Sequence, residues 1–185
     1  MSSTKNTLLV IPNTDVDVLQ SIIKNYTESR PLETIEHSRF TRSILTDTSL
    51  ESFGVYLCDP AQRLISAYRV MVKRDRNHIG TFEDFYSKQQ RTNFYSRLLK
   101  DVNLSSIGFI GLREHLHKSI MMAADWQGST LYRVPYGGNV TQAPQEELPQ
   151  KDLDKIKMLY ADDYELYEKV KSNFDKRWSA YKANY

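Results

Sequence analysis

The chain has 185 residues, of which 40% are hydrophobic, so it is long enough for one domain with a sizeable core and too short for two ordinary domains. Its 25 basic and 23 acidic residues nearly cancel, which leaves no net field of the kind that attracts nucleic acid. The single cysteine, Cys58, excludes an internal disulfide and is typical of a reducing, cytoplasmic setting.

The first segment predicts a buried strand followed by a helix. Leu8 to Ile11 form a continuous apolar run, which is typical of a strand covered on both faces of a parallel sheet. The run is too short for a signal-peptide core or a membrane span, so we expect neither cleaved secretion nor a membrane partner. Apolar residues then recur at helical spacing from Val16 to Tyr26, with Thr14 or Asp15 as N-cap.

The polar stretch from Thr27 to Leu50 predicts at most one short helix or strand, near Ile35. A second strand is predicted over residues 53–57, followed by a helix that Asp59 caps and in which Pro60 occupies the first turn. We expect Arg63, on this helix, to form a structural ion pair with Asp59. The face expected to be buried comprises Leu64, Ile65, Tyr68 and Val72.

Further along, residues 81–86 contain a capping box that predicts a short helix. Residues 107–111 predict a third strand, and residues 113–126 predict the helix after it. Because strands and helices alternate, we expect an α/β fold with a parallel sheet. Residues 128–149 are rich in glycine and proline and predict loops.

Two helices are predicted at the end, over residues 152–160 and from Asp162 or Asp163 almost to the last residue. The second would extend about 35 Å at 1.5 Å per residue. Its aromatic residues recur every three or four positions, and those up to Val170 are expected to pack on the sheet. The remaining ones are predicted to contact a protein partner or a second copy of the chain: Phe174, Trp178, Tyr181 and Tyr185. The alternative is that the whole stripe is core.

Four segments, in this order, resemble the carbohydrate-type sulfotransferases that use 3′-phosphoadenosine 5′-phosphosulfate. Residues 9–19 resemble the family's strand and phosphate loop, Ile-Pro-Lys-Thr-Gly-Gly-Thr-Ser-Leu. Residues 54–69 resemble its strand ending in Arg-Asp-Pro and the helix that carries Arg and then Ser-Ala-Tyr. Residues 107–116 resemble Phe-Val-Gly-x-x-Glu-x-Leu, and residues 134–139 with 153–167 resemble a loop Asn and the closing Tyr-rich helix.

The resemblance implies a three-layer, P-loop-like sulfotransferase core with a short parallel sheet and a long C-terminal helix. The single domain would span residues 1–185, with the α/β core over 1–160 and a helical extension over 161–185. The resemblance also implies positions for cofactor binding. These are Asn13 and Thr14 on the loop, and Arg63 and Ser66 on the helix.

At four family positions this sequence carries the wrong chemistry for an anion. Asn13 replaces the loop Lys, Asp15 and Val16 replace the two glycines, and Cys58 replaces the Arg of Arg-Asp-Pro. A carboxylate about 4 Å from a phosphate charge costs on the order of 4 kcal/mol at a dielectric near 20. Each lost charge-assisted bond removes roughly 1.5–3 kcal/mol more, against the roughly 8 kcal/mol of a micromolar complex. We therefore predict that no cofactor binds, and that Ser66 packs as a structural residue.

Other candidate groups have simple explanations. His37 lies where the family places an acceptor-side base, but a solvated loop histidine is the interpretation we favour. Glu114, His115 and His117 do not share one metal-binding face, so no metal site is predicted. We expect Asp15 and Asp17 to stabilise the start of a helix, with a cation or a different nucleotide as the weaker alternative.

The sequence thus leads to two hypotheses. The first is a sulfotransferase-like fold reused as a non-catalytic binding or structural module, such as a subunit of an oligomeric or viral assembly, in the cytoplasm or within a viral particle. The alternative is a divergent sulfotransferase that transfers a sulfuryl group to a hydroxyl acceptor, with Arg63, Ser66 and His37 taking part.

Overall fold

The computed structural model describes residues 6–26, 33–36, 52–74, 80–88, 92–100, 102–129 and 147–184. Within them the chain builds one four-stranded parallel sheet in the order β2-β1-β3-β4. The strands are β1 (Thr7–Val10), β2 (Glu33–Glu36), β3 (Phe53–Leu57) and β4 (Phe109–Leu112). The predicted α/β class and parallel sheet are confirmed, and the weak signal near Ile35 is the edge strand β2.

The strands are apolar because the sheet is covered on both faces. All five residues of β3 and all four of β4 are buried. Leu9 of β1 lies opposite Val55 of β3, and Val55 lies opposite Ile110 of β4, so one row of side chains crosses the sheet. Continuous apolar runs, without polar alternation, are what a parallel sheet requires.

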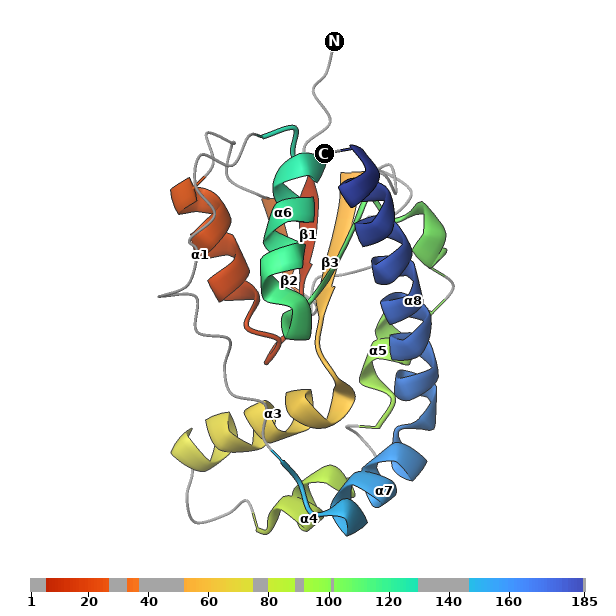
Figure 1. Ribbon diagram of the computed structural model, residues 1–185. Coiled ribbons are helices and arrows are strands. Elements are labelled where there is room, and N and C mark those ends of the chain that lie inside the picture. Colours follow the sequence, from red (N-terminus) through yellow and green to blue (C-terminus); the bar gives the residue numbers. More distant parts are fainter. Residues whose placement is uncertain are drawn as a thin grey trace.

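Three helices run along the sheet. They are α1 (Val16–Tyr26), α6 (Leu116–Trp126) and α8 (Ala161–Asn184), and they appear side by side in Figure 1. A 3₁₀ turn, η5 (Arg113–His115), joins β4 to α6. None of the helices in the described ranges is both long and apolar enough to cross a membrane.

A second group of helices packs below the carboxyl ends of the strands (Figure 1): α3 (Pro60–Arg74), α4 (Phe82–Tyr86) and α7 (Gln150–Leu159). They enclose their own apolar cluster, which comprises Ala61, Leu64, Phe85, Tyr86, Ile156 and Tyr160. Asp59 Oδ1 accepts a hydrogen bond from Ala61 N at 2.8 Å, as expected of the N-cap of α3. Thr81 and Asp84 form the predicted capping box of α4. Two short elements, α5 (Phe94–Leu98) and η4 (Leu104–Ser106), complete the described fold.

Helix α8 corrects one prediction. Phe174 is 0% exposed and its ring stacks on His115, with centroids 5.4 Å apart, so it is a core residue and its predicted partner contact is wrong. The buried face therefore continues a full turn beyond Val170. Trp178 and Tyr181 are half-buried against the same core, while Tyr185 lies outside the described residues.

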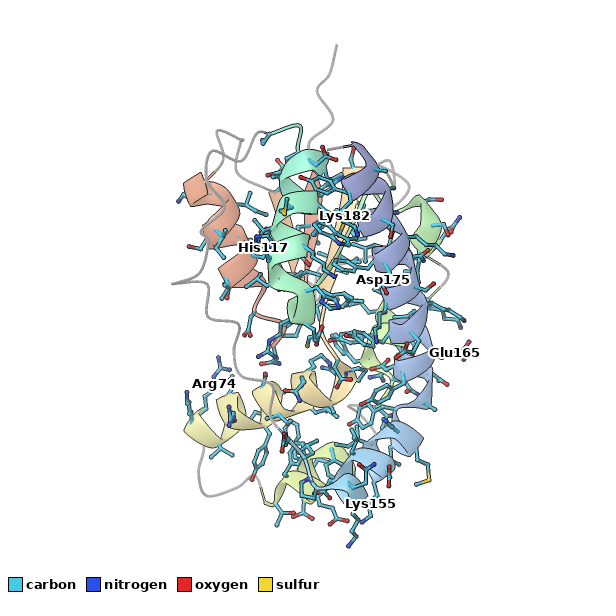
Figure 2. The ribbon with its side chains drawn as sticks, in the orientation of Figure 1. Arg74, His117, Lys155, Glu165, Asp175 and Lys182 are labelled. Atoms are coloured by element: carbon cyan, nitrogen blue, oxygen red, sulfur yellow. The ribbon has the colours of Figure 1, made fainter. Side chains whose placement is uncertain are left out.

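The opposite side of α8 carries charged side chains. Figure 2 labels Glu165, Asp175 and Lys182 along this helix, and all three are exposed. Glu165 pairs with Lys169 one turn later, at 2.5 Å. Helix α8 is therefore an amphipathic helix whose apolar face belongs to the domain itself.

Candidate functional site

The carboxyl ends of β1, β3 and β4 define the place where a ligand site is expected. From β1 the chain crosses to β2 on one side, and it later returns to place β3 on the other side of β1. In open parallel sheets, ligands bind in the crevice outside the carboxyl ends at such a change of direction. The segments that border it are residues 11–15, 58–59 and 113–114, together with the start of α3.

The loop after β1, residues 11–15, has an unusual backbone. Asn13 and Asp15 both have positive φ, 64° and 56°, a region that favours glycine because a Cβ atom is crowded there. Asp15 stands where the resembling family has a glycine. Thr14 is fully buried, and its hydroxyl donates to Ile11 O at 2.8 Å, so this side chain closes the loop on itself.

Arg113, which directly follows β4, contacts the β1 loop and helix α3. Its Nε lies 2.7 Å from Asp15 Oδ2, and its Nη1 donates to Ser66 Oγ at 3.4 Å. Arg113 is 8% exposed, so the guanidinium side of this ion pair is buried. One side chain thus links the β1 loop, the end of β4 and helix α3. Asp15 supplies the negative charge that a bound anion would otherwise bring to this cation.

Sequence reasoning singled out Asp15 and Ser66 but missed Arg113. A signal was present, because Arg113 directly follows the third predicted strand, and residues after parallel strands gather at one edge of the sheet. The position of Arg113 at that edge could therefore be predicted from the topology. Its contacts with Asp15 and Ser66 could not be predicted in this way.

Cys58 lies beneath the crevice. Its Sγ is 3.8 Å from Asn13 O and 3.5 Å from Tyr95 Oη, and the Tyr95 hydroxyl is within 3.1 Å of Cys58 O. Burial, assisted by the charge of Glu114, raises the pKa of the thiol to about 12. The thiol is therefore protonated at neutral pH, in accord with the predicted inert residue.

Glu114 joins three elements at the same edge. Its Oε1 accepts a hydrogen bond from Asp59 N at 2.6 Å, and its Oε2 accepts one from the Tyr167 hydroxyl at 3.0 Å. Burial raises the pKa of this carboxyl, and the nearby charge of Asp59 adds to the effect, although the hydrogen bonds act against it. Glu114 therefore ties the start of α3 and the first half of α8 to the end of β4.

The neighbouring histidines do not extend the site. His115 stacks on Phe174, and His117 is exposed on α6 (Figure 2). Among the described residues, no group of three or more His, Cys, Asp or Glu side chains could hold a metal ion. His37 and the loop around Asn139 lie outside the described residues, so the roles predicted for them stay predictions.

Arg63 is away from the crevice surface. It is 6% exposed, and its Cζ lies 4.7 Å from the ring centroid of Phe94 and 5.1 Å from that of Tyr95. No ion pair joins it to Asp59 among the described contacts, because the Asp59 carboxylate caps α3 instead. The predicted Arg63–Asp59 pair is therefore wrong.

Comparisons with protein-family models and with curated protein sequences found no match to this chain. The chemistry of the crevice therefore has to be argued from its own residues. Arg113 joins Asp15 to Ser66, and Glu114 separately accepts hydrogen bonds from Asp59 N and the Tyr167 hydroxyl.

Proposed function

We propose that this chain is a sulfotransferase-like fold reused as a non-catalytic binding or structural module. The observation that carries the proposal is the contact of Arg113 with Asp15 at 2.7 Å. This ion pair lies on the β1 loop, at the position where the family resemblance implies a phosphate.

A phosphate entering the β1 loop would meet Asp15 first. It would have to displace this carboxylate from Arg113, or accept like-charge repulsion on the order of 4 kcal/mol at about 4 Å. The loop adopts a positive φ at Asp15 even though this residue is not glycine. The loop therefore keeps its shape with a carboxylate at the position where the family has a glycine. Cys58 supplies no positive charge in compensation, because its thiol is neutral and fully buried.

The alternative function is a divergent sulfotransferase. Ser66 favours it, because its hydroxyl lies at the crevice, within hydrogen-bond reach of Arg113. In that case Arg113 would turn from Asp15 to the cofactor, Ser66 would bind its 3′-phosphate, and His37 would serve as base. Arg63 contributes little to this hypothesis, since its guanidinium packs between aromatic rings.

Titration calorimetry with adenosine 3′,5′-bisphosphate separates the two functions. We expect no saturable binding by the wild-type chain up to about 1 mM. The variant Asp15→Gly removes the competing carboxylate and suits the positive φ, so any residual affinity should rise in it. Asp17→Asn is the matched control, because it removes an exposed carboxylate from the first turn of α1, two residues after Asp15. Micromolar binding by the wild type, lost in Ser66→Ala, would establish the sulfotransferase hypothesis instead.

A binding or structural module also needs a partner surface, and α8 offers only the half-buried Trp178 and Tyr181. Light scattering over a range of concentrations would measure self-association directly. The informative variant is Tyr181→Ser, because truncating the buried Phe174 would open the core. A monomer at every concentration would exclude assembly of this chain with itself.

A further inference from the structure

Helices α3, α5 and α8 meet around polar atoms that have no hydrogen-bond partner in the protein. These atoms are Arg63 Nε and Nη2, Asp163 Oδ2 and Asn93 Oδ1. All of them are buried. Helix α8 contacts both α3 and α5, so the three residues belong to one junction. Proteins almost always pair such atoms, with protein groups or with ordered water.

The other atoms of these side chains hold them in place. Asp163 is 0% exposed, and its Oδ1 accepts a hydrogen bond from Ser96 N at 2.8 Å, in the first turn of α5. Asn93, which precedes α5, donates through Nδ2 to Asp162 Oδ2 at 2.8 Å. The guanidinium of Arg63 packs on the rings of Phe94 and Tyr95 in the same helix. Each group is therefore fixed next to α5 by one end and leaves its other end unpaired.

The unpaired atoms are complementary in charge and in hydrogen bonding. Arg63 contributes N–H donors, whereas Asp163 Oδ2 and Asn93 Oδ1 are acceptors. The positive charge of Arg63 lowers the pKa of Asp163, although burial outweighs this and the net shift is upward. The two charges thus act on each other, but no hydrogen bond joins Arg63 Nη2 to Asp163 Oδ2.

We propose that an ordered water molecule bridges Arg63 and Asp163 and completes a buried ion pair at this junction. The water accepts from an Arg63 N–H and donates to Asp163 Oδ2, and its second hydrogen is directed to Asn93 Oδ1. A water molecule suits the site better than an ion, because the charges of Arg63 and Asp163 already cancel. The bridge fixes the first turn of α8 to α3 and α5.

A crystal structure of the wild-type chain, at a resolution that locates ordered waters, tests the proposal directly. We expect a water within hydrogen-bond distance of both Arg63 and Asp163 Oδ2. Direct contact between the guanidinium and the carboxylate would overturn the proposal. So would an anion at this place, which crystals grown in bromide would reveal by anomalous scattering.

Two adjacent carboxylates provide a matched pair of variants in solution. Asp163→Asn leaves the buried Arg63 without a counter-charge, so we expect the equilibrium constant for unfolding to rise about 100-fold or more. Asp162→Asn changes an exposed neighbour and is expected to alter it by no more than about threefold. In the double variant Arg63→Met, Asp163→Asn, the fold-change in the equilibrium constant for unfolding should be smaller than the product of the fold-changes in the two single variants. Independent, multiplicative effects would show that the two residues are not coupled.

Discussion

Two arginines lie buried near the carboxyl end of the sheet, and their surroundings differ. Arg113 makes a direct ion pair with Asp15 and reaches Ser66, all in the crevice where a ligand is expected. Arg63 packs on two aromatic rings, and its charge acts on Asp163 without a hydrogen bond from Nε or Nη2. Arg63 is the residue that the family resemblance assigns to the cofactor, yet Arg113 is the one in the crevice. A matching residue type at a matching position is therefore weak evidence for a retained role.

The partners of the two arginines also differ in exposure. The side chain of Asp15 is 36% exposed, so water can solvate its carboxylate when the ion pair is broken. Asp163 is fully buried, so water cannot solvate its carboxylate in the same way. The energetic cost of losing each arginine should therefore be unequal, and mutation can measure the difference.

The largest effect is expected for Arg63→Met, which leaves the buried Asp163 carboxylate without its counter-charge. Breaking a buried pair by removing one partner costs about 3–5 kcal/mol, and we expect a loss of stability in this range. Urea unfolding followed by circular dichroism is the measurement. A loss below about 1 kcal/mol would mean that Asp163 is solvated, and the contrast with Arg113 would disappear.

A smaller effect is expected at the crevice. Asp15→Asn removes the carboxylate that pairs with the mostly buried Arg113 and should cost about 1.5–3 kcal/mol, the range for losing a hydrogen bond to a charged group. Arg113→Met leaves the part-exposed Asp15 carboxylate without its partner, and methionine replaces most of the apolar packing of the arginine side chain. The loss of stability should therefore be smaller than for Asp15→Asn. If Arg113→Met lowers the free energy of unfolding as much as Arg63→Met does, then the exposure of the carboxylate partner does not control the loss of stability.

The smallest effect concerns pH. Burial raises the pKa of Glu114 above its ordinary value of 4.5, so its contribution to stability is complete below pH 4.5 and is lost as pH rises through the folded-state pKa. The free energy of unfolding of the wild type, relative to Glu114→Gln, should therefore fall as pH rises above 4.5.

Glu165→Gln is the control for this measurement, because Lys169 lowers the pKa of the exposed Glu165. Its contribution has the opposite sign, since it is present above pH 4.5 and is lost as pH falls. Thermal unfolding of the three proteins across this pH range is sufficient. If the free energy of unfolding of the wild type, relative to Glu114→Gln, instead increases with pH, the raised pKa of Glu114 is contradicted.

Much of the fold follows from local patterns. The apolar runs of β1, β3 and β4, the Asp59 cap of α3 and the capping box of α4 are all visible in the sequence. The edge strand β2 gave a weak signal, because two of its four residues are Glu and it lies at the edge of the sheet. The end of the buried face of α8 was misplaced, since spacing alone cannot tell a core aromatic from an exposed one.

By itself, the sequence determined the α/β class and the order of the main elements, because these depend on residue type and local periodicity. Only the tertiary structure decided which charges meet. The pairing of Arg113 with Asp15 joins residues 98 positions apart, and the charge of Arg63 acts on Asp163, which is 100 positions away. Such contacts depend on how helices pack around the sheet, and no local pattern encodes that arrangement.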